Sequence, residues 1–424
     1  MALLDVGVMF AAIAVVGFVA KRLDQSVIPF YILAGMLLGP FVLGRIELPT
    51  AIELGEATLG PTLPSITEGE FIVIGAELGI VLLLFFLGLE FNLERLLAAK
   101  DRIGKVGTLD FVVNFGVGLA LGFAIFRSLL PAFLVAGIVY ISSSAIITKT
   151  LIDLEWIAND EAEPMLGTLV YEDLVIAVYL AVASALVLGG DDLADAAGGI
   201  GVAMAFILGL LVLVAYGTSF FERVLQTNSN EMIVLRAIGV TVLISGAALA
   251  LGVSEAVAAF FVGMAFSPTE YVDDLEHLLE PLRDTFAAVF FFWIGLVTDP
   301  ALFPAVAGLI AVAVVLTTPT KLVTGFLSGK VYGLNDRRSV RVGLGMTTRG
   351  EFSLIIAAIA ASGAGLALTE ATAGTIYAFA VGYVLVMSVL GTTFMRYSGA
   401  FERRVLSLRG SDEVGTTTDQ HRSP

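Results

Sequence analysis

Apolar stretches long enough to cross a membrane recur along this chain, and they constrain its fold more than any other feature. A segment in lipid must satisfy its own backbone hydrogen bonds, so stretches of this length are expected to fold as helices. The composition agrees, because 58% of the 424 residues are hydrophobic and 15% are charged, whereas soluble proteins carry about a quarter charged residues. The chain is therefore predicted to be an all-α integral membrane protein. We predict thirteen transmembrane helices, near residues 4–20, 26–44, 71–91, 106–126, 131–151, 164–188, 199–219, 231–251, 254–267, 284–299, 303–328, 341–363 and 373–396.

The basic residues of the connecting segments fall unevenly on the two sides of these spans. If the spans alternate in direction, one side holds most of the Lys and Arg, and the other holds only Arg45 and Arg127. Basic residues favour the cytoplasmic side, so we expect the N-terminus outside and the C-terminus inside. The N-terminus lacks a basic region typical of a cleaved signal peptide, and the first span is expected to remain.

Composition also excludes several classes of function. The formal net charge is −16, which argues against nucleic acid as a partner. The chain has no cysteine, which excludes disulfides and thiol-based metal sites. The two histidines, His277 and His421, lie in an acidic loop and in the tail. We therefore expect no cofactor and no enzyme activity.

An internal repeat is visible in the sequence. Residues 28–40 and 255–268 share a Gly-Met pair followed at the same spacing by Pro, and the next spans match again at 84–89 and 291–296. Chance matches of common residues are the alternative, but two ordered matches in consecutive spans argue against it. The copies begin seven spans apart, an odd number, so they have opposite orientations. Inverted repeats, here about 26–188 and 254–397, are typical of transporters whose site lies at mid-membrane, where broken helices meet.

The repeat predicts where the broken helices are, in spans five and twelve. Hydroxyl groups can satisfy the freed backbone, and Gly permits unusual dihedral angles. Ordinary Ser/Thr packing between helices is the alternative, but opposite charges at one depth favour a break, because they can neutralise exposed half-helix ends. The residues expected at this crossing are Ser142, Ser143, Ser144 and Thr148 of span five, and Thr347, Thr348, Arg349 and Glu351 of span twelve.

Two adjacent carboxylates, Glu172 and Asp173, lie inside span six. Acids at bilayer depth are costly and usually face a pathway or a partner; a short loop or a structural ion pair is the alternative. Lys321 lies equally deep in span eleven. It is expected to pair with one of these carboxylates, unless it extends to the interface.

Other charges are given a structural interpretation. Glu90 and Asp110 lie near the predicted cytoplasmic ends of spans three and four, and we expect them to pair locally with Arg95 or Lys105. The segment 398–424 is polar and is predicted to be a disordered cytoplasmic tail.

Several motifs, taken in order, resemble one family. They are 79–90 (GIVLLLFFLGLE), Leu33-Ala34-Gly35 through Gly39-Pro40, the run Ser142–Ser144, Phe290–Phe292 with Gly295, and Arg349-Gly350-Glu351-Phe352. The chain resembles the second branch of the monovalent cation/proton antiporter superfamily, which includes Kef-type K⁺/H⁺ and related Na⁺/H⁺ antiporters. The likeness runs from Ala2 to Tyr397, so residues 1–397 are expected to form one transmembrane antiporter domain.

The resemblance implies an ion site where spans five and twelve cross. Asp173 matches the family's ion-binding Asp, and Lys321 matches a Lys that pairs with the site carboxylates in sodium-exchanging relatives. Glu172 stands where relatives usually carry Asn, Asp or Gln, which leaves stoichiometry and ion preference open. Arg349 and Glu351 match the charges of the crossing helices.

The resemblance also implies alternating-access exchange of K⁺ or Na⁺ for H⁺ across the cell membrane by a homodimer in the lipid bilayer. Many Kef-like relatives carry a soluble nucleotide-binding domain after the last span. This sequence shows no such segment, so a separate nucleotide- or ligand-sensing protein is the expected regulator. A Na⁺-coupled symporter with the same crossed helices, or a cation channel, is the alternative function. A retinal protein would also pair a membrane Lys with Asp, but is built from about seven helices.

Overall fold

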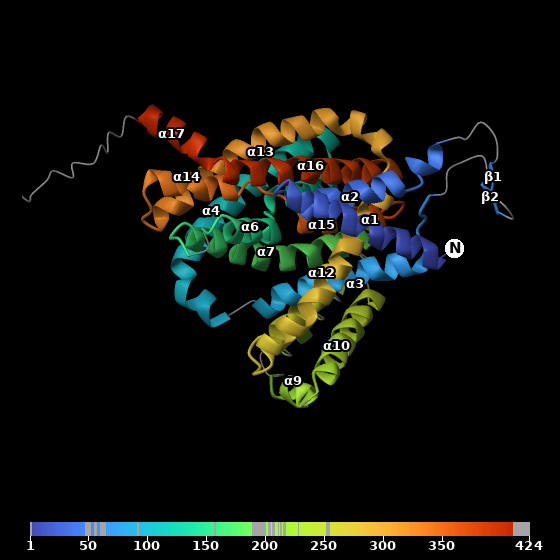
Figure 1. Ribbon diagram of the computed structural model, residues 1–424. Coiled ribbons are helices and arrows are strands. Elements are labelled where there is room, and N and C mark those ends of the chain that lie inside the picture. Colours follow the sequence, from blue (N-terminus) through green and yellow to red (C-terminus); the bar gives the residue numbers. More distant parts are fainter. Residues whose placement is uncertain are drawn as a thin grey trace, which may run out of the picture.

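The computed structural model describes residues 2–46, 52–54, 57–59, 65–90, 93–156, 158–188, 218–227, 229–251 and 255–409, with isolated positions between 201 and 214. These residues form a helical protein with one small hairpin (Figure 1). The elements before the middle of the chain are α1 (Ala2–Arg22), α2 (Val27–Leu38), η1 (Leu43–Arg45), β1 (Ile52–Leu54), β2 (Ala57–Leu59), α3 (Glu70–Glu90), α4 (Leu93–Phe126), α5 (Leu129–Tyr140), α6 (Ser144–Asp153), α7 (Ala162–Leu188) and α9 (Thr218–Leu225). They are followed by α10 (Asn230–Ala250), α11 (Glu255–Phe266), α12 (Val272–Leu296), η2 (Pro300–Leu302), α13 (Phe303–Val331), α14 (Asp336–Gly345), α15 (Glu351–Ser362), α16 (Glu370–Arg396) and α17 (Ser398–Arg409).

The helices pack mainly within two groups. In the first group α2 packs on α12, and α3 packs on both α11 and α12, with α10 beside α11. In the second group α4 packs on α5, α7 and α13, while α14 packs on α13 and α15 on α16. Figure 1 shows α13 and α16 running alongside each other, away from α10 and α12. Contacts between the groups are fewer and include α2 with α16 and α7 with α11.

Glycine contacts repeat in the first group with the symmetry expected of an inverted repeat. A Cβ on Gly35 of α2 would lie 1.9 Å from the carbonyl oxygen of Phe292 in α12, and one on Gly263 of α11 would lie 2.0 Å from that of Phe85 in α3. These are equivalent pairs in the two sequence copies. The partners Gly88 and Gly295 show the same closeness to Phe260 and Ile32. Each Gly therefore lets two helix backbones touch where no side chain fits.

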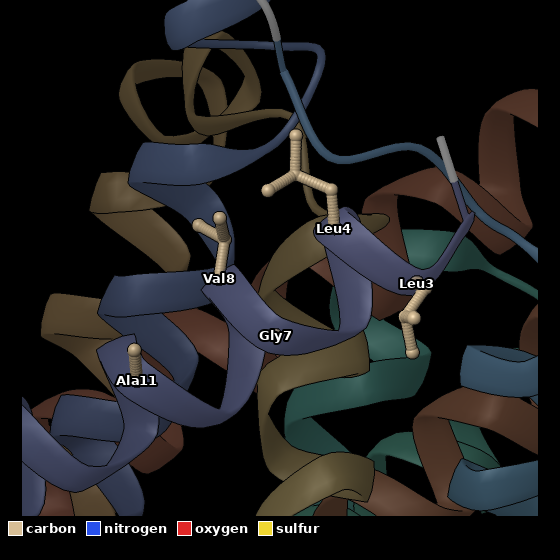
Figure 2. A pocket seen from close by; sticks show the side chains of 5 residues that line it. All are labelled: Leu3, Leu4, Gly7, Val8 and Ala11. Atoms are coloured by element: carbon tan, nitrogen blue, oxygen red, sulfur yellow. The ribbon is translucent and has the colours of Figure 1, made fainter.

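The apolar surface suits a membrane. Nine segments of the part that the structure describes are long and apolar enough to span one, and α11 and α15 are shorter apolar helices. The span expected at 199–219 lies largely outside the described residues, so the count of thirteen stays a prediction. A shallow hollow on the outer face of α1 is lined by Leu3, Leu4, Gly7, Val8 and Ala11 (Figure 2). Such a face is compatible with hydrocarbon.

The predicted disordered tail was wrong over its first residues. Residues 398–409 form α17, and the buried carboxylate of Glu402 accepts hydrogen bonds from Arg341 and Arg337 of α14. Arg341 also donates to Glu161, before α7, at 2.6 Å. These ion pairs join the last described helix to the rest of the protein. Residues 410–424 lie outside the described residues.

Candidate functional site

Two interrupted helices meet at the centre of the second group. Helices α5 and α6 are separated at residues 141–143, and α14 and α15 at residues 346–350. The N–H of Ser143 donates to the carbonyl oxygen of Thr348 at 3.3 Å, so the two breaks touch. A Cβ on Gly350 would lie 2.4 Å from the Ser143 Oγ. The crossing therefore requires glycine at residue 350.

The four half-helix ends at the crossing are met by two charged side chains. Glu351 accepts from the Oγ atoms of Ser143 and Ser144 at 2.7 and 3.1 Å and from the N–H of Ala145 at 3.3 Å, at the start of α6. It also begins α15. Helix N-termini carry partial positive charge, so one carboxylate faces two of them.

Arg349 contacts the other two half-helix ends, the C-terminal ends of α5 and α14. Its Nε donates to the carbonyl oxygen of Val139 near the end of α5 at 3.0 Å, and its Nη1 donates to those of Met346 and Thr348 just after α14. The guanidinium is fully buried. Thr347 Oγ1 donates to the Leu344 carbonyl oxygen at 2.7 Å. Freed carbonyls at both C-terminal ends therefore have donors.

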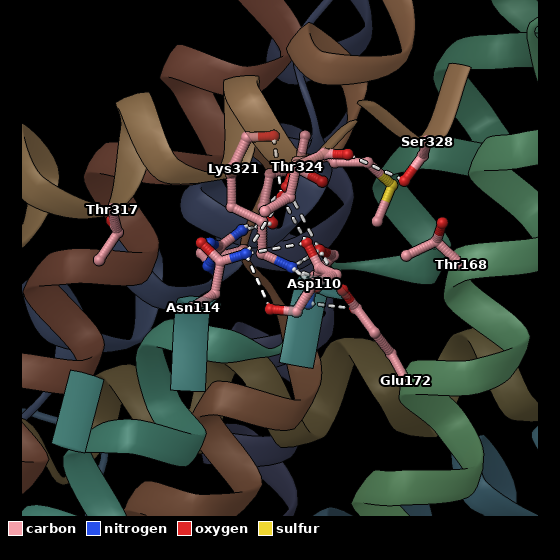
Figure 3. Close-up of polar contacts among 12 residues, drawn as sticks. Asp110, Asn114, Thr168, Glu172, Thr317, Lys321, Thr324 and Ser328 are labelled. Atoms are coloured by element: carbon pink, nitrogen blue, oxygen red, sulfur yellow. Dashed lines mark hydrogen bonds and ion pairs between the residues drawn. The ribbon is translucent and has the colours of Figure 1, made fainter. Parts of the chain in front are cut away.

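Lys321 of α13 lies beside this crossing and is fully buried (Figure 3). Its Nζ lies 2.6 Å from Oε1 of Glu172 on α7 and 2.6 Å from Oδ2 of Asp110 on α4. It also donates to Ser142 Oγ at 3.2 Å, so all three ammonium hydrogens have acceptors. Ser142 in turn donates through N–H to Glu172 Oε2 at 2.7 Å and through Oγ to Oε1 at 3.0 Å. The cluster around Lys321 is therefore hydrogen-bonded directly to the break between α5 and α6.

Asp110 is held by a second set of side chains. Its Oδ1 accepts from Asn114 Nδ2 at 2.9 Å and from Thr324 Oγ1 at 2.7 Å. All three residues are buried. Figure 3 shows Asp110 and Asn114 projecting from α4 towards Lys321 and Thr324. The close packing of α4 on α7 that places Asp110 here depends on Gly107, whose Cβ would lie 2.1 Å from the Tyr171 ring.

Asp173 follows Glu172 on α7 and is 6% exposed. The side chains that contact Lys321 in the described part of the chain include two carboxylates, those of Asp110 and Glu172, near one ammonium group. Uncompensated charge is expensive in a membrane interior. This excess of carboxylates favours a bound cation or protons, and hard oxygen ligands suit alkali metal ions.

Comparison with known proteins identifies the family. Residues 8–397 match the family described as sodium/hydrogen exchanger, transmembrane. The chain belongs to this family. The exchanger is 34% identical over 390 residues to the K⁺/H⁺ antiporter subunit KhtU of Bacillus subtilis, covering 91% of each chain. It is 28% identical over 421 residues to the ammonium/H⁺ antiporter subunit AmhT of Alkalihalophilus pseudofirmus, covering 97% of each chain.

A solved structure supports the fold of this exchanger. The sodium proton antiporter MjNhaP1 of Methanocaldococcus jannaschii superposes with a TM-score of 0.70, covering 96% of this chain and 99% of that one, at 15% identity. The predicted antiporter-type membrane fold is confirmed by this match.

Most of the residues expected at the site of this exchanger come together. Lys321 was expected to pair with Glu172 or Asp173, and the structure pairs it with Glu172. The loop residues of both breaks form the contacts described above, and Thr348 Oγ1 donates to the Gly345 carbonyl oxygen at 3.4 Å. Thr148 lies half-buried in α6, beyond the break.

The expectation that Asp110 pairs locally with Arg95 or Lys105 was wrong. The residue is 1% exposed and pairs with Lys321, and sequence reasoning also missed Asn114 and Thr324. The depth of Asp110 in the membrane, compared with that of Lys321, is the signal that would have identified this pair. Asp110 lies 16 residues before the end of α4 at Phe126 (126 − 110), and Lys321 lies 18 residues after the start of α13 at Phe303 (321 − 303). At 1.5 Å per residue, these residues have nearly the same depth. The side chain of Glu90 lies outside the described residues.

Proposed function

We propose that this exchanger moves a monovalent cation against protons at Glu172 and Asp173, by alternating access. The observation that carries the proposal is the buried ion pair between Lys321 and Glu172 at the contact of two broken helices. Charged residues inside a membrane are costly and rare, and they commonly mark an ion pathway. Family membership and relatives named as K⁺/H⁺ and ammonium/H⁺ antiporters support exchange as the activity.

The proposed mechanism follows from competition at one site. In the cation-loaded state Asp173 is ionised and binds K⁺ or Na⁺, with Glu172 and the hydroxyl groups and carbonyls of the break as further ligands. In the return state Asp173 is protonated, or Lys321 recovers its proton and pairs with a carboxylate; the ion pair of Lys321 with Glu172 supports this. Because cation and proton exclude each other, their fluxes are coupled. Two neighbouring carboxylates in a low-dielectric site titrate as a coupled pair, so we expect transport to change steeply with pH.

The proposed setting is the cell membrane, with the N-terminus outside and the C-terminus in the cytoplasm, as a homodimer. Two relatives are named as subunits, which supports a separate regulatory protein as a partner. Helix α17 is the proposed route for regulation, which is supported by the contact of Glu402 with α14, the first half of a broken helix.

The test is dye-monitored proton flux in proteoliposomes, with Na⁺ or K⁺ added across a pH series. Wild-type protein is expected to release protons in response to at least one cation, and Asp173→Asn is expected to lose this response. Normal exchange by the variant would remove Asp173 from the mechanism. Uptake of an organic solute driven by Na⁺, or single-channel currents, would support the symporter or the channel instead.

A further inference from the structure

The two carboxylates that contact Lys321 are held in different ways. Asp110 accepts its hydrogen bonds from Lys321, Asn114 and Thr324, all on α4 or α13. Glu172 accepts from Lys321 and from both donors of Ser142, which lies in a helix break and next to α6. The set around Asp110 therefore does not involve the crossing, whereas the set around Glu172 depends on it.

This difference matters when a cation arrives. A cation at Glu172 and Asp173 must displace the ammonium group of Lys321 from Glu172, because both compete for the same oxygens. An ammonium without a carboxylate is strongly disfavoured in a buried site. Asp110 already lies 2.6 Å from the Nζ atom, so Lys321 need not become unpaired.

We propose that Asp110 is a positioning residue that retains the Lys321 ammonium while the transported cation occupies Glu172 and Asp173. Asn114 and Thr324 fix the carboxylate for this task. The proposal rests on the proposed exchange at Glu172 and Asp173, and it assigns Asp110 no contact with the cation. Of the two carboxylates that pair with Lys321 in the described part of the chain, removal of Asp110 leaves Glu172, so the ammonium then competes more strongly with the cation.

The test measures cation binding in the purified, full-length protein and does not require transport. NaCl or KCl is titrated at constant ionic strength with choline chloride, and the rise in melting temperature gives an apparent Kd. Asp110→Asn is expected to raise the apparent Kd about ten-fold or more, the effect of about one charge-assisted hydrogen bond. In a Lys321→Gln background the same substitution is expected to change the apparent Kd less than about two-fold, because there is no ammonium to retain.

Equal effects in both backgrounds would overturn the proposal, since Asp110 would then act only through its charge. If Asp110→Asn does not yield folded protein, Thr324→Val decides the question, because it removes one hydrogen bond to Asp110 while keeping its charge. Thr324→Val is expected to raise the apparent Kd with Lys321 present and not in its absence. Thr320→Val is the matched control, because its Oγ1 contacts only carbonyl oxygens of its own helix. Equal Kd values for these two variants would also contradict the proposal.

The outcomes of these experiments distinguish failure of the proposed role of Asp110 from failure of the proposed cation/proton exchange. Wild-type protein that shows neither cation binding nor cation-driven proton flux would overturn the exchange itself. Wild-type binding and flux, with no dependence on Lys321 in the Asp110 variants, would overturn only the role of Asp110.

Discussion

At the scale of single residues, the charged residues at the crossing were predictable, and the ion-pair partner of Asp110 was not. Arg349 and Glu351 follow directly from the physics of helix ends, because a break exposes partial charges that a chain must neutralise. Asp110 has basic neighbours in sequence, and its true partner is 211 residues away. Only the relative depth of α4 and α13 brings the two together, and depth requires knowing where both helices end.

The contacts of Glu351 lead to a prediction for one residue. Glu351→Gln keeps one acceptor but removes the charge that faces the start of α6 and two serine hydroxyl groups. We expect a loss of about 1–3 kcal/mol of stability, the size of charge-assisted hydrogen bonds, and slower exchange. Thermal unfolding and proton flux measure both. Glu370→Gln is the control, since Glu370 lies exposed in the first turn of α16. Equal stability of the two variants would show that Glu351 does not hold the crossing together.

At the scale of elements, the sequence indicated the two breaks because hydroxyl residues and glycine interrupt apolar stretches there. It did not indicate that α17 forms. Residues 398–409 are polar, and the contact that orders them is the burial of Glu402 between arginines of α14. Such a tertiary contact leaves no local pattern in the sequence.

The glycines at the close contacts between α2 and α12 and between α3 and α11 predict that one added methyl group strongly lowers stability. In Gly263→Ala the new Cβ would lie 2.0 Å from the Phe85 carbonyl oxygen, so α3 and α11 must separate. Overpacking of this kind costs about 1–3 kcal/mol or more. The expected result is a lower melting temperature and a lower yield of folded protein. Gly308→Ala on α13 meets nothing within 4 Å and should be tolerated. Similar melting temperatures for the two variants would contradict the close approach of α3 and α11.

The attachment of α17 should depend on pH. Burial raises the pKa of Glu402, but hydrogen bonds and the positive charges of Arg341 and Arg337 outweigh burial and leave this pKa below its usual value of 4.5. The carboxylate therefore stabilises the contact fully above the unfolded pKa, and this stabilisation is lost as pH falls through the lower, folded pKa. Hydrogen exchange of residues 398–409 at pH 7 should be faster in Glu402→Gln than in wild type. Unchanged exchange would mean that other contacts hold α17.

At the scale of the whole molecule, two groups of helices meet through few contacts, which is the arrangement that relative motion requires. One of the contacts between them is the hydrogen bond that Thr392 Oγ1 on α16 donates to Gln25 Oε1, before α2, at 2.7 Å. The predicted inverted repeat did not indicate this grouping, because the groups combine helices from both copies.

A cross-link between the groups should stop transport if they move against each other. The sequence contains no cysteine, so Gln25→Cys with Thr392→Cys introduces the only two thiols. A short bifunctional thiol reagent is expected to abolish proton flux, and cleavage of the linker should restore it. The control pair is Lys149→Cys with Asp153→Cys, one turn apart and exposed on α6. Full activity of the cross-linked first pair would rule out relative movement at this contact.

The pairing of Arg349 and Glu351 with the four half-helix ends has a consequence for how such a protein can change over time. The crossing neutralises its own partial charges, so its structure does not depend on the transported ion. The field at the ion is then adjusted by a few side chains on α4, α7 and α13, in addition to the groups that the break provides. Substitutions among those side chains can alter which ion is carried while the architecture remains the same, so transport specificity can evolve separately from the fold.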